Sequence, residues 1–139
     1  MGWIEVRAVQ HSIDWDDLQA IGATGARGVP NHRPLEVTKH LDKSTPLLNR
    51  ICCQGKPIVR VTLEIVSTAR NERIVLHKIE FEEAFIVGMA LDLNSIGVQF
   101  VEKVRLIYRR ITWTHVVLDR ETMRPQGQIV ENWDLARGD

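Results

Sequence analysis

The stretch Asp42-Lys-Ser-Thr-Pro-Leu-Leu-Asn-Arg-Ile-Cys-Cys-Gln-Gly55 decides the fold class, because it is a helix signal standing alone in a chain whose other segments have the patterns of strands. Ser44, or Thr45, is a suitable N-cap, and Pro46 is tolerated because the first helical turn has no intrahelical donor to lose. Apolar residues then recur at roughly helical spacing, and Gly55 provides a left-handed exit. The stretch predicts one short helix, about residues 44–54, on the flank of a sheet.

The remaining segments alternate apolar and polar residues, which is typical of half-buried strands. In the segment 58–67 the alternation predicts that Val59, Val61, Leu63 and Ile65 face inward. Many strands with one short helix predict a single domain, residues 1–139, that is mainly β and forms an antiparallel β-barrel or sandwich. Strands are expected over residues 3–13, 35–41, 58–67, 101–118 and 129–133. Residues 74–81 and 84–91 are expected to form one long strand or two, with a bend at 82–83, and a loop at 119–128 and a loose tail at 136–139 are also expected.

Composition limits the classes of function. The chain has 139 residues, of which 44% are hydrophobic and 26% charged, as in an ordinary soluble domain. Its formal net charge is zero, which argues against nucleic-acid binding through bulk positive charge. No apolar run reaches membrane-spanning length, and the first residues alternate and carry charge, unlike a secretory signal. We expect a cytoplasmic protein which, if it leaves the cell, does so without a cleavable signal.

Groups that bind metals or phosphates are present, but not in ligating patterns. The five histidines are scattered with no two at ligand spacing. His11 lies near Asp14, Asp16 and Asp17, which fit a solvated acidic turn better than a metal site. The glycines between residues 22 and 28 are followed by prolines rather than by a helix, so they do not form a phosphate cradle. We therefore expect no metal and no nucleotide.

The candidates for catalysis also have structural explanations. Cys52 and Cys53 are adjacent, cannot bridge each other and are expected as free thiols, with Cys52 in the core. Ser44 is not surrounded by a nucleophile elbow. Glu82 and Glu83 are strand neighbours whose side chains point to opposite faces. The sequence predicts no catalytic residue and no cofactor, so we do not expect an enzyme.

The segment 101–118 is the longest predicted strand, and neither of its faces is typical of a solvated surface. Either one face meets the core while the other meets another copy or a ligand, or the long arginine stems cover exposed apolar surface. The two faces hold Arg105, Ile107, Arg109, Ile111 and Trp113, and Leu106, Tyr108, Arg110, Thr112 and Thr114.

Three strings in this sequence resemble the Hcp family, the haemolysin-coregulated proteins of the bacterial type VI secretion system. They are Val37-Thr-Lys-His-Leu-Asp-Lys-Ser-Thr-Pro-Leu-Leu48, Cys53-Gln-Gly-Lys56 and Glu102-Lys-Val-Arg-Leu-Ile-Tyr-Arg-Arg-Ile-Thr-Trp-Thr114. The resemblance covers about residues 3–118 and implies a small β-barrel with a helix on its flank. It also implies hexameric rings that stack head to tail into the inner tube and bind effectors in the lumen. The implied partners are further copies of the chain and the sheath, spike and effector proteins, with no nucleic acid and no membrane insertion.

The resemblance also gives candidate assembly residues. Ring assembly requires a strand such as 101–118, in which one face meets the core and the other meets another copy. The candidate ring-interface residues on it are Arg105, Arg109, Arg110 and Trp113. The Gly/Pro-rich segment 22–34 matches the extended loop through which rings contact their neighbours. Its candidate stacking residues are Gly22, Gly25, Arg27, Gly28 and His32.

One feature departs from the family pattern. Members usually begin with a further strand before the Trp-Ile-Glu-Val segment, whereas this sequence starts Met1-Gly-Trp-Ile-Glu-Val6. Without that strand a sheet edge is open, to be filled by another chain, by the tail or by changed pairing. The alternatives to a tube subunit are a non-tube effector-binding or chaperone module, a divergent truncated family member, or a small hydrolase or metalloprotein on the same barrel.

Overall fold

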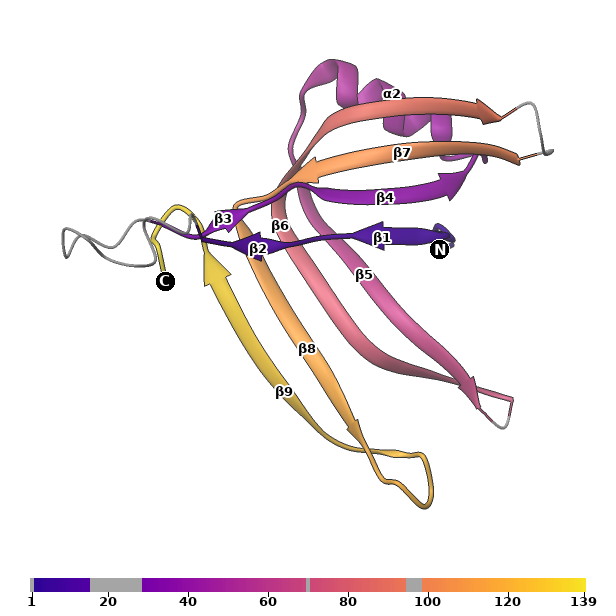
Figure 1. Ribbon diagram of the computed structural model, residues 1–139, viewed down its shortest axis with the longest axis vertical. Coiled ribbons are helices and arrows are strands. Elements are labelled where there is room, and N and C mark those ends of the chain that lie inside the picture. Colours follow the sequence, from indigo (N-terminus) through magenta and orange to yellow (C-terminus); the bar gives the residue numbers. More distant parts are fainter. Residues whose placement is uncertain (1, 16–28, 70, 95–98) are drawn as a thin grey trace. The chain divides into compact units, whose positions relative to one another are not determined.

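Strands make up most of the chain (Figure 1). The computed structural model describes residues 2–15, 29–69, 71–94 and 99–139. Within these ranges the strand pairs are antiparallel and α2 is the one helix, which confirms the expected mainly β class with a single short helix. The elements are β1 Ala8–Gln10, β2 Ile13–Asp14, β3 Asn31–His32, β4 Leu35–His40, α2 Thr45–Gln54, β5 Ile58–Ala69, β6 Glu72–Asn94, β7 Gln99–Ile107, β8 Arg110–Leu118 and β9 Pro125–Asp134.

The chain forms two compact units, and neither is a contiguous piece of sequence. The first consists of Met1–Pro57 and Phe85–Ile107, and the second of Ile58–Ala84 and Tyr108–Asp139. The strand β6 supplies its carboxyl-terminal part to the first unit and its amino-terminal part to the second. No helix among the described residues is both long and apolar enough to span a membrane.

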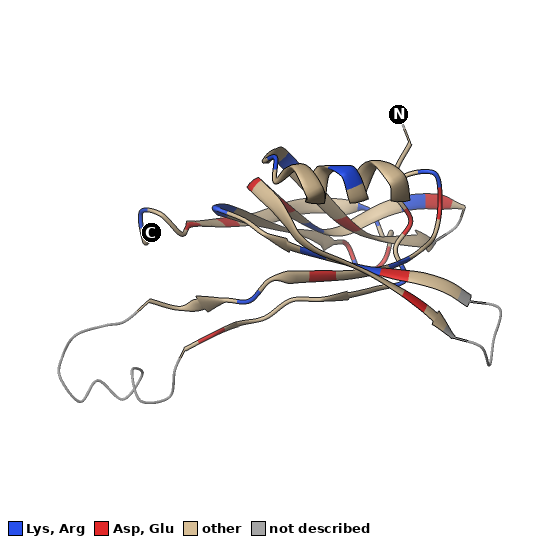
Figure 2. Ribbon diagram, turned by 90° about the horizontal axis from the view of Figure 1, so that it is seen from above, with Lys and Arg blue, Asp and Glu red and all other residues tan. Residues whose placement is uncertain are grey.

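In the first unit the strands follow the order β1-β4-β7-β6. The buried apolar residues of this sheet lie in register on one face, since Leu35 is opposite Leu106 and Val37 is opposite Val104. The helix α2 lies across one face of the sheet (Figure 2). A shorter pairing joins β2 to β3.

The helix is placed as expected, but it is less deeply packed than its spacing predicts. It spans Thr45–Gln54, and Gly55 ends it with φ 61°, in the left-handed region, where its N–H bonds the carbonyls of Ile51 and Cys52. No helix residue is fully buried, and Leu47 is 60% exposed. The expectation that Cys52 belongs to the core is therefore wrong: it is half-buried, while both cysteines are free thiols as predicted.

In the second unit the strands follow the order β5-β6-β8-β9. Phe81 and Ile111 face each other across β6 and β8 and are almost completely buried, and the ring of Tyr108 packs 4.9 Å from that of Phe81. Burial raises the pKa of Tyr108. Two of the residues expected to face inward do not: Val59 is 84% exposed and Ile65 is 50% exposed.

The expectation of an unbroken strand over residues 101–118 is wrong. The chain leaves β7 after Ile107 and enters β8 at Arg110, and this interruption changes the phase of burial. Leu106 and Tyr108 are buried at even positions, but the next buried residue, Ile111, is at an odd one. By contrast, residues 74–94 belong to one continuous strand, β6.

The backbone irregularities of β6 and the β7–β8 junction face each other. Glu83, at the expected bend in β6, has a φ of 49°. Opposite it, the Arg109 N–H donates to the carbonyl oxygen of Glu82 at 3.1 Å. This hydrogen bond thus joins β6 to the β7–β8 junction at the point where both segments leave regular strand geometry.

The ends of the chain also differ from expectation. The predicted strand 3–13 is reduced to β1 and the short β2, and β9 begins at Pro125, inside the predicted loop 119–128. The tail is not loose. Asp134 accepts hydrogen bonds from the N–H groups of Ala136 and Arg137, and its own N–H donates to the carbonyl oxygen of Asp139 at 2.8 Å.

Candidate functional site

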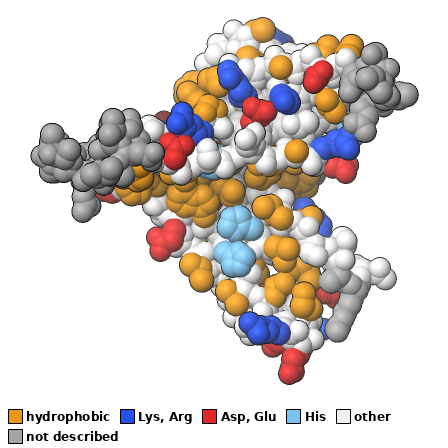
Figure 3. All heavy atoms as spheres, viewed as in Figure 1, with side chains coloured by type: hydrophobic (Ala, Val, Ile, Leu, Met, Phe, Trp, Pro, Cys, Tyr) orange, Lys and Arg blue, Asp and Glu red, His pale blue; other side chains and the backbone are white. Residues whose placement is uncertain are grey.

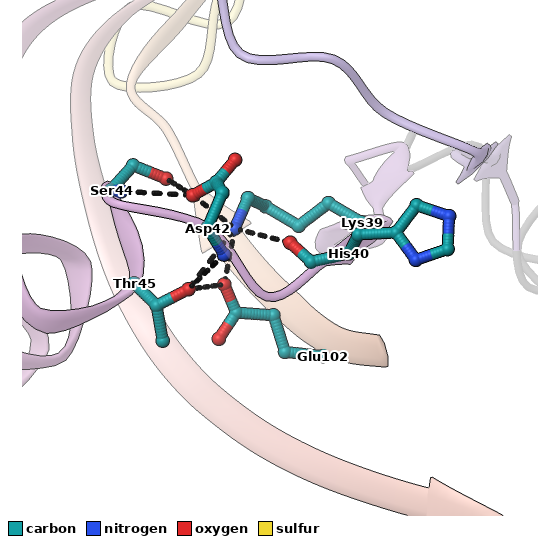
Figure 4. Close-up of polar contacts among 6 residues, drawn as sticks. All are labelled: Lys39, His40, Asp42, Ser44, Thr45 and Glu102. Carbon is teal, nitrogen blue, oxygen red and sulfur yellow. Dashed lines mark hydrogen bonds and ion pairs between the residues drawn. The ribbon is translucent and has the colours of Figure 1, made fainter. Parts of the chain in front are cut away.

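A buried ion pair joins the first family-like string to the third (Figure 4). Lys39 on β4 is paired in register with Glu102 on β7, and the Lys39 ammonium donates to the Glu102 carboxylate. The side chains are 1% and 4% exposed. The same ammonium reaches the His40 carbonyl at 3.0 Å and Asp42 Oδ1 at 3.1 Å. Burial of a charge is expensive unless it is paired and hydrogen-bonded, and this group is surrounded by acceptors.

The start of α2 is built into this network. Thr45 Oγ1 accepts from the Asp42 N–H at 3.1 Å and donates to Glu102 Oε1 at 2.9 Å. Ser44 occupies the N-cap position as predicted, but its side chain makes no capping bond to the helix. Instead, the Asp42 carboxylate accepts hydrogen bonds from the Ser44 N–H, at 2.8 Å, and from the Ser44 hydroxyl. The pKa of Asp42 is lowered, chiefly by the hydrogen bond from the Ser44 hydroxyl and further by the hydrogen bond from Lys39.

The sequence contained a signal for this network that was missed. Lys39 continues the inward phase of Leu35 and Val37, and Glu102 stands in phase with Val104 and Leu106. A charged residue on the buried phase of each of two strands indicates a cross-strand ion pair once their register is known. The register came only from the structure.

The candidate ring-interface residue in the first unit is Arg105, which lies exposed on β7 over the backbone of β6. A Cβ placed on Gly88 would come within 2.8 Å of its Nε, so the absence of a side chain at Gly88 leaves room for the guanidinium. A bulge between Ile86 and Gly88 accompanies this contact. No ion pair of Arg105 with another residue of the described ranges is observed.

The other three candidates belong to the second unit. Arg109 pairs with Glu83 at 3.2 Å and lies 3.8 Å from Asp134; its hydrogen bond to Glu83 is the main cause of its raised pKa. Arg110 lies 3.6 Å from Glu82. Trp113 is half-buried on β8. The two arginines are therefore part-exposed cations that already have acidic neighbours within the chain.

Of the candidate stacking residues, only His32 is in the described part of the chain; Gly22, Gly25, Arg27 and Gly28 lie outside it. His32 is on β3, opposite Ile13 on β2. Burial lowers the pKa of His32, and burial together with the nearby charge of His32 lowers that of His11.

The expected acidic turn is only partly described, because Asp16 and Asp17 fall outside the described residues. Asp14 lies in β2 and forms an ion pair with Arg33 at 3.1 Å. Hydrogen bonds from Arg33 and then Asn31 lower its pKa. Within the described ranges no three histidine, cysteine or acidic side chains are grouped as a metal site requires.

Each unit exposes large apolar side chains on its sheet. In the first unit Phe85 and Ile107 are opposite each other and are 36% and 43% exposed. In the second, Val59 on β5 and Ile129 on β9 are more exposed still. Large contiguous patches of exposed apolar side chains are typical of surfaces that another molecule covers, whereas single exposed residues are normal on a monomer.

Comparison with known proteins assigns the chain to a family. A family model described as "Type VI secretion system effector, Hcp" matches residues 1–115. The "Major exported protein" of Pseudomonas aeruginosa is 31% identical over 108 residues, which is 73% of this chain and 61% of that protein's length. The chain thus spans about three-fifths of this relative.

Solved structures show the same fold. A type six secretion system protein has a TM-score of 0.82 at 21% identity, covering 99% of this chain and 85% of that one. Hcp1 from Salmonella typhimurium has a TM-score of 0.76 at 18% identity, covering 97% and 82%. Given the family match over residues 1–115, the chain belongs to the Hcp family of type VI secretion proteins.

Proposed function

We propose that the chain is a structural subunit of the type VI secretion inner tube, with no catalytic role. The family match over residues 1–115 is the observation that carries this proposal. Copies of the chain associate into closed rings, expected to be hexamers, which stack and hold effectors in the lumen. The sheath and spike are the other partners, and the protein is exported with the tube without a signal peptide.

The exposed apolar side chains support association between copies. A heterologous interface that closes into a ring covers the same two patches on every subunit and leaves neither free. Exposed residues such as Phe85, Ile107 and Val59 are costly in a monomer and are covered in such a ring. The zero net charge of the chain offers no general repulsion between copies.

The candidate residues fit the rim of an interface rather than its centre. Arg105, Arg109 and Arg110 are solvent-accessible cations, and charged groups at a rim set the register and choice of partner more than the affinity. Trp113 supplies an aromatic contact to the neighbouring copy of the chain. Ring stacking is assigned to the segment that holds Gly22, Gly25, Arg27, Gly28 and His32.

Mass in solution tests the proposal. Light scattering on the purified chain is expected to give several times the mass of one chain. Arg109→Glu is expected to lower that mass, because it reverses a charge at the interface. A chain that stays monomeric at high concentration overturns the proposal, and a monomer that retains a co-expressed effector identifies an effector-binding module instead.

The Arg109 variant needs a matched control, because Arg109 also pairs with Glu83 inside the chain at 3.2 Å. The double variant Glu83→Arg/Arg109→Glu keeps an opposite-charge pair there but inverts its direction. If Arg109 acts between copies, the double variant remains impaired in assembly. If the single variant acts only by weakening the fold, the double variant recovers the parent's mass.

A further inference from the structure

Two histidines that are far apart in sequence lie directly opposite each other in the second unit. His77 on β6 and His115 on β8 are partners in the antiparallel register. Their Nδ1 atoms are 3.3 Å apart, and the rings are tilted by 53° with centroids 5.5 Å apart. Both rings are accessible to solvent, and histidine side chains gather among hydrophobic ones on the face seen in Figure 3.

The spacing of the two nitrogens fits a shared metal ion. Zinc binds imidazole nitrogen at about 2.0–2.1 Å, so tetrahedral geometry separates two such nitrogens by about 3.3–3.4 Å. The observed Nδ1 separation of 3.3 Å, at which one ring can also donate a hydrogen bond to the other, matches this distance. A neutral imidazole is also the side chain that zinc, nickel and copper share as a ligand.

The sheet holds the two ligands in place. β6 and β8 are interior strands of the second unit, with β5 and β9 on their outer sides. In the same row, Ile65 is opposite His77 and Ile129 is opposite His115, so the register neighbour on the outer side of each ring is apolar. Backbone pairing on both sides fixes the Cα positions, which lowers the entropic cost of binding a metal at two points.

We propose that His77 and His115 form a two-nitrogen site for a divalent transition metal ion of the zinc, nickel and copper class, with water in the remaining positions. The site lies within one chain and does not depend on ring assembly. A metal bound there ties β6 to β8 and stabilises the second unit, because it binds the folded chain and not the separated strands.

Direct titration tests the site. The metal-free chain is titrated with zinc chloride by calorimetry, and one ion per chain is expected. Changing only the groups that orient a ligand typically costs about 10- to 100-fold in metal affinity, so His77→Gln or His115→Gln is expected to weaken binding at least tenfold. The matched control is His40→Gln, an exposed histidine on β4, which is expected to bind as the parent does.

Spectroscopy on the unaltered chain provides a test that needs no variant. With one equivalent of copper(II), electron paramagnetic resonance is expected to show coupling to two imidazole nitrogens. Coupling to one nitrogen, unchanged affinity in both histidine variants, or one ion per two chains would each overturn the proposal. The first outcome assigns binding to a lone histidine, the second places it elsewhere, and the third places it between copies.

Discussion

Lys39 is a charged residue at a position where the alternation of β4 calls for an apolar one. Its ammonium is acceptable there only because Glu102, Asp42, Thr45 and the His40 carbonyl surround it. A buried pair of this kind is weak evidence for net stability, since desolvation offsets much of the attraction. Its clearer effect is on specificity, because the pair is satisfied in only one register of β4 against β7.

Removing one partner is therefore expected to cost far more than removing both. Lys39→Met leaves the Glu102 carboxylate buried and unpaired, and we expect a loss of about 3–5 kcal/mol in the free energy of unfolding. The double variant Lys39→Met/Glu102→Leu is expected to recover most of that loss. Urea unfolding of the two single variants and the double variant measures the coupling.

The control for this cycle is Lys103→Met. Lys103 is the sequence neighbour of Glu102 but is about half exposed and lies 3.6 Å from Glu36. An exposed pair contributes about 0–1 kcal/mol, so this change is expected to be small. Equal losses at positions 39 and 103 would contradict the assignment of a buried pair.

The shifted pKa values predict that acid weakens the fold in two stages. His11 and His32 have lowered pKa values in the folded chain, so the unfolded chain takes up protons first as the pH falls below the ordinary value of 6.5, and stability falls. Asp14 and Asp42 also have lowered pKa values. The stability they give is present above the ordinary value of 3.8 and is lost as the pH falls further through their folded values.

Urea midpoints measured from pH 8 to pH 3 check both stages. His32→Gln is expected to reduce the fall in the first window and to leave the second unchanged. Asp42→Asn is expected to act in the second window. A urea midpoint that rises on acidification from pH 7 to pH 5 would contradict the direction expected for His11 and His32.

Among the elements, α2 was predicted almost to the residue, because its start and end depend on local chemistry. Pro46 and Gly55 specify the first turn and the exit whatever the rest of the chain does. The side-chain hydrogen bonds at the start of the helix were not predictable in the same way. The Ser44 hydroxyl donates to Asp42 instead of capping the helix, and Asp42 also accepts from Lys39. The network includes Glu102, which only long-range strand pairing brings to the site.

The break between β7 and β8, unlike the bounds of α2, has no local signal in the sequence. No glycine or proline marks residues 108 and 109, so alternation alone continues through them. The interruption lies opposite an irregular part of β6, where Glu83 takes a positive φ and the Glu82 carbonyl accepts from the Arg109 N–H. The candidate interface residues were assigned to one unbroken strand, whereas Arg105 belongs to one unit and Arg109, Arg110 and Trp113 to the other.

The left-handed exit of α2 is expected to require glycine. Gly55→Ala places a Cβ in a conformation that costs about 1–2 kcal/mol for an L-residue, although there is open space around it. The matched control is Gly127→Ala in β9, which also has open space and lacks a positive φ. Thermal unfolding is expected to show a clear loss for the first variant and little change for the second.

At the scale of the whole molecule, the family and the fold class were predictable from the sequence, but the surfaces were not. The alternation in 58–67 was right about which residues share a face and wrong about what covers Val59 and Ile65. Alternation reports which side of a strand is apolar. It does not say whether the covering atoms belong to the same chain or to another copy.

Association between copies is expected to make the apparent stability depend on protein concentration. We expect the midpoint of thermal unfolding to rise with concentration for the parent chain. Val59→Ser should change the stability of one chain by less than about 0.5 kcal/mol, because Val59 is 84% exposed. If copies cover it, the same change reduces the concentration dependence.

Thr62→Ser serves as the comparison, since it changes the opposite face of β5 and keeps a hydroxyl group. A midpoint that is independent of concentration in all three proteins would exclude association through this face of β5. Scanning calorimetry over a hundredfold range of concentration is sufficient to decide.

The separation of 63 positions along the sequence between Lys39 and Glu102 also has a consequence for biosynthesis. A ribosome adds about 5–20 residues per second, so β4 leaves the exit tunnel roughly 3–13 seconds before its partner β7. During that interval β5 and the first half of β6 emerge, which pair with each other in the folded chain, while Leu35 and Val37 still lack the strand that buries them. The first unit, which ends at Ile107, is completed before the second, which still needs β8 and β9. Its apolar face nevertheless stays uncovered until β7 emerges, so nascent chains are most exposed to premature association just before residue 102 appears.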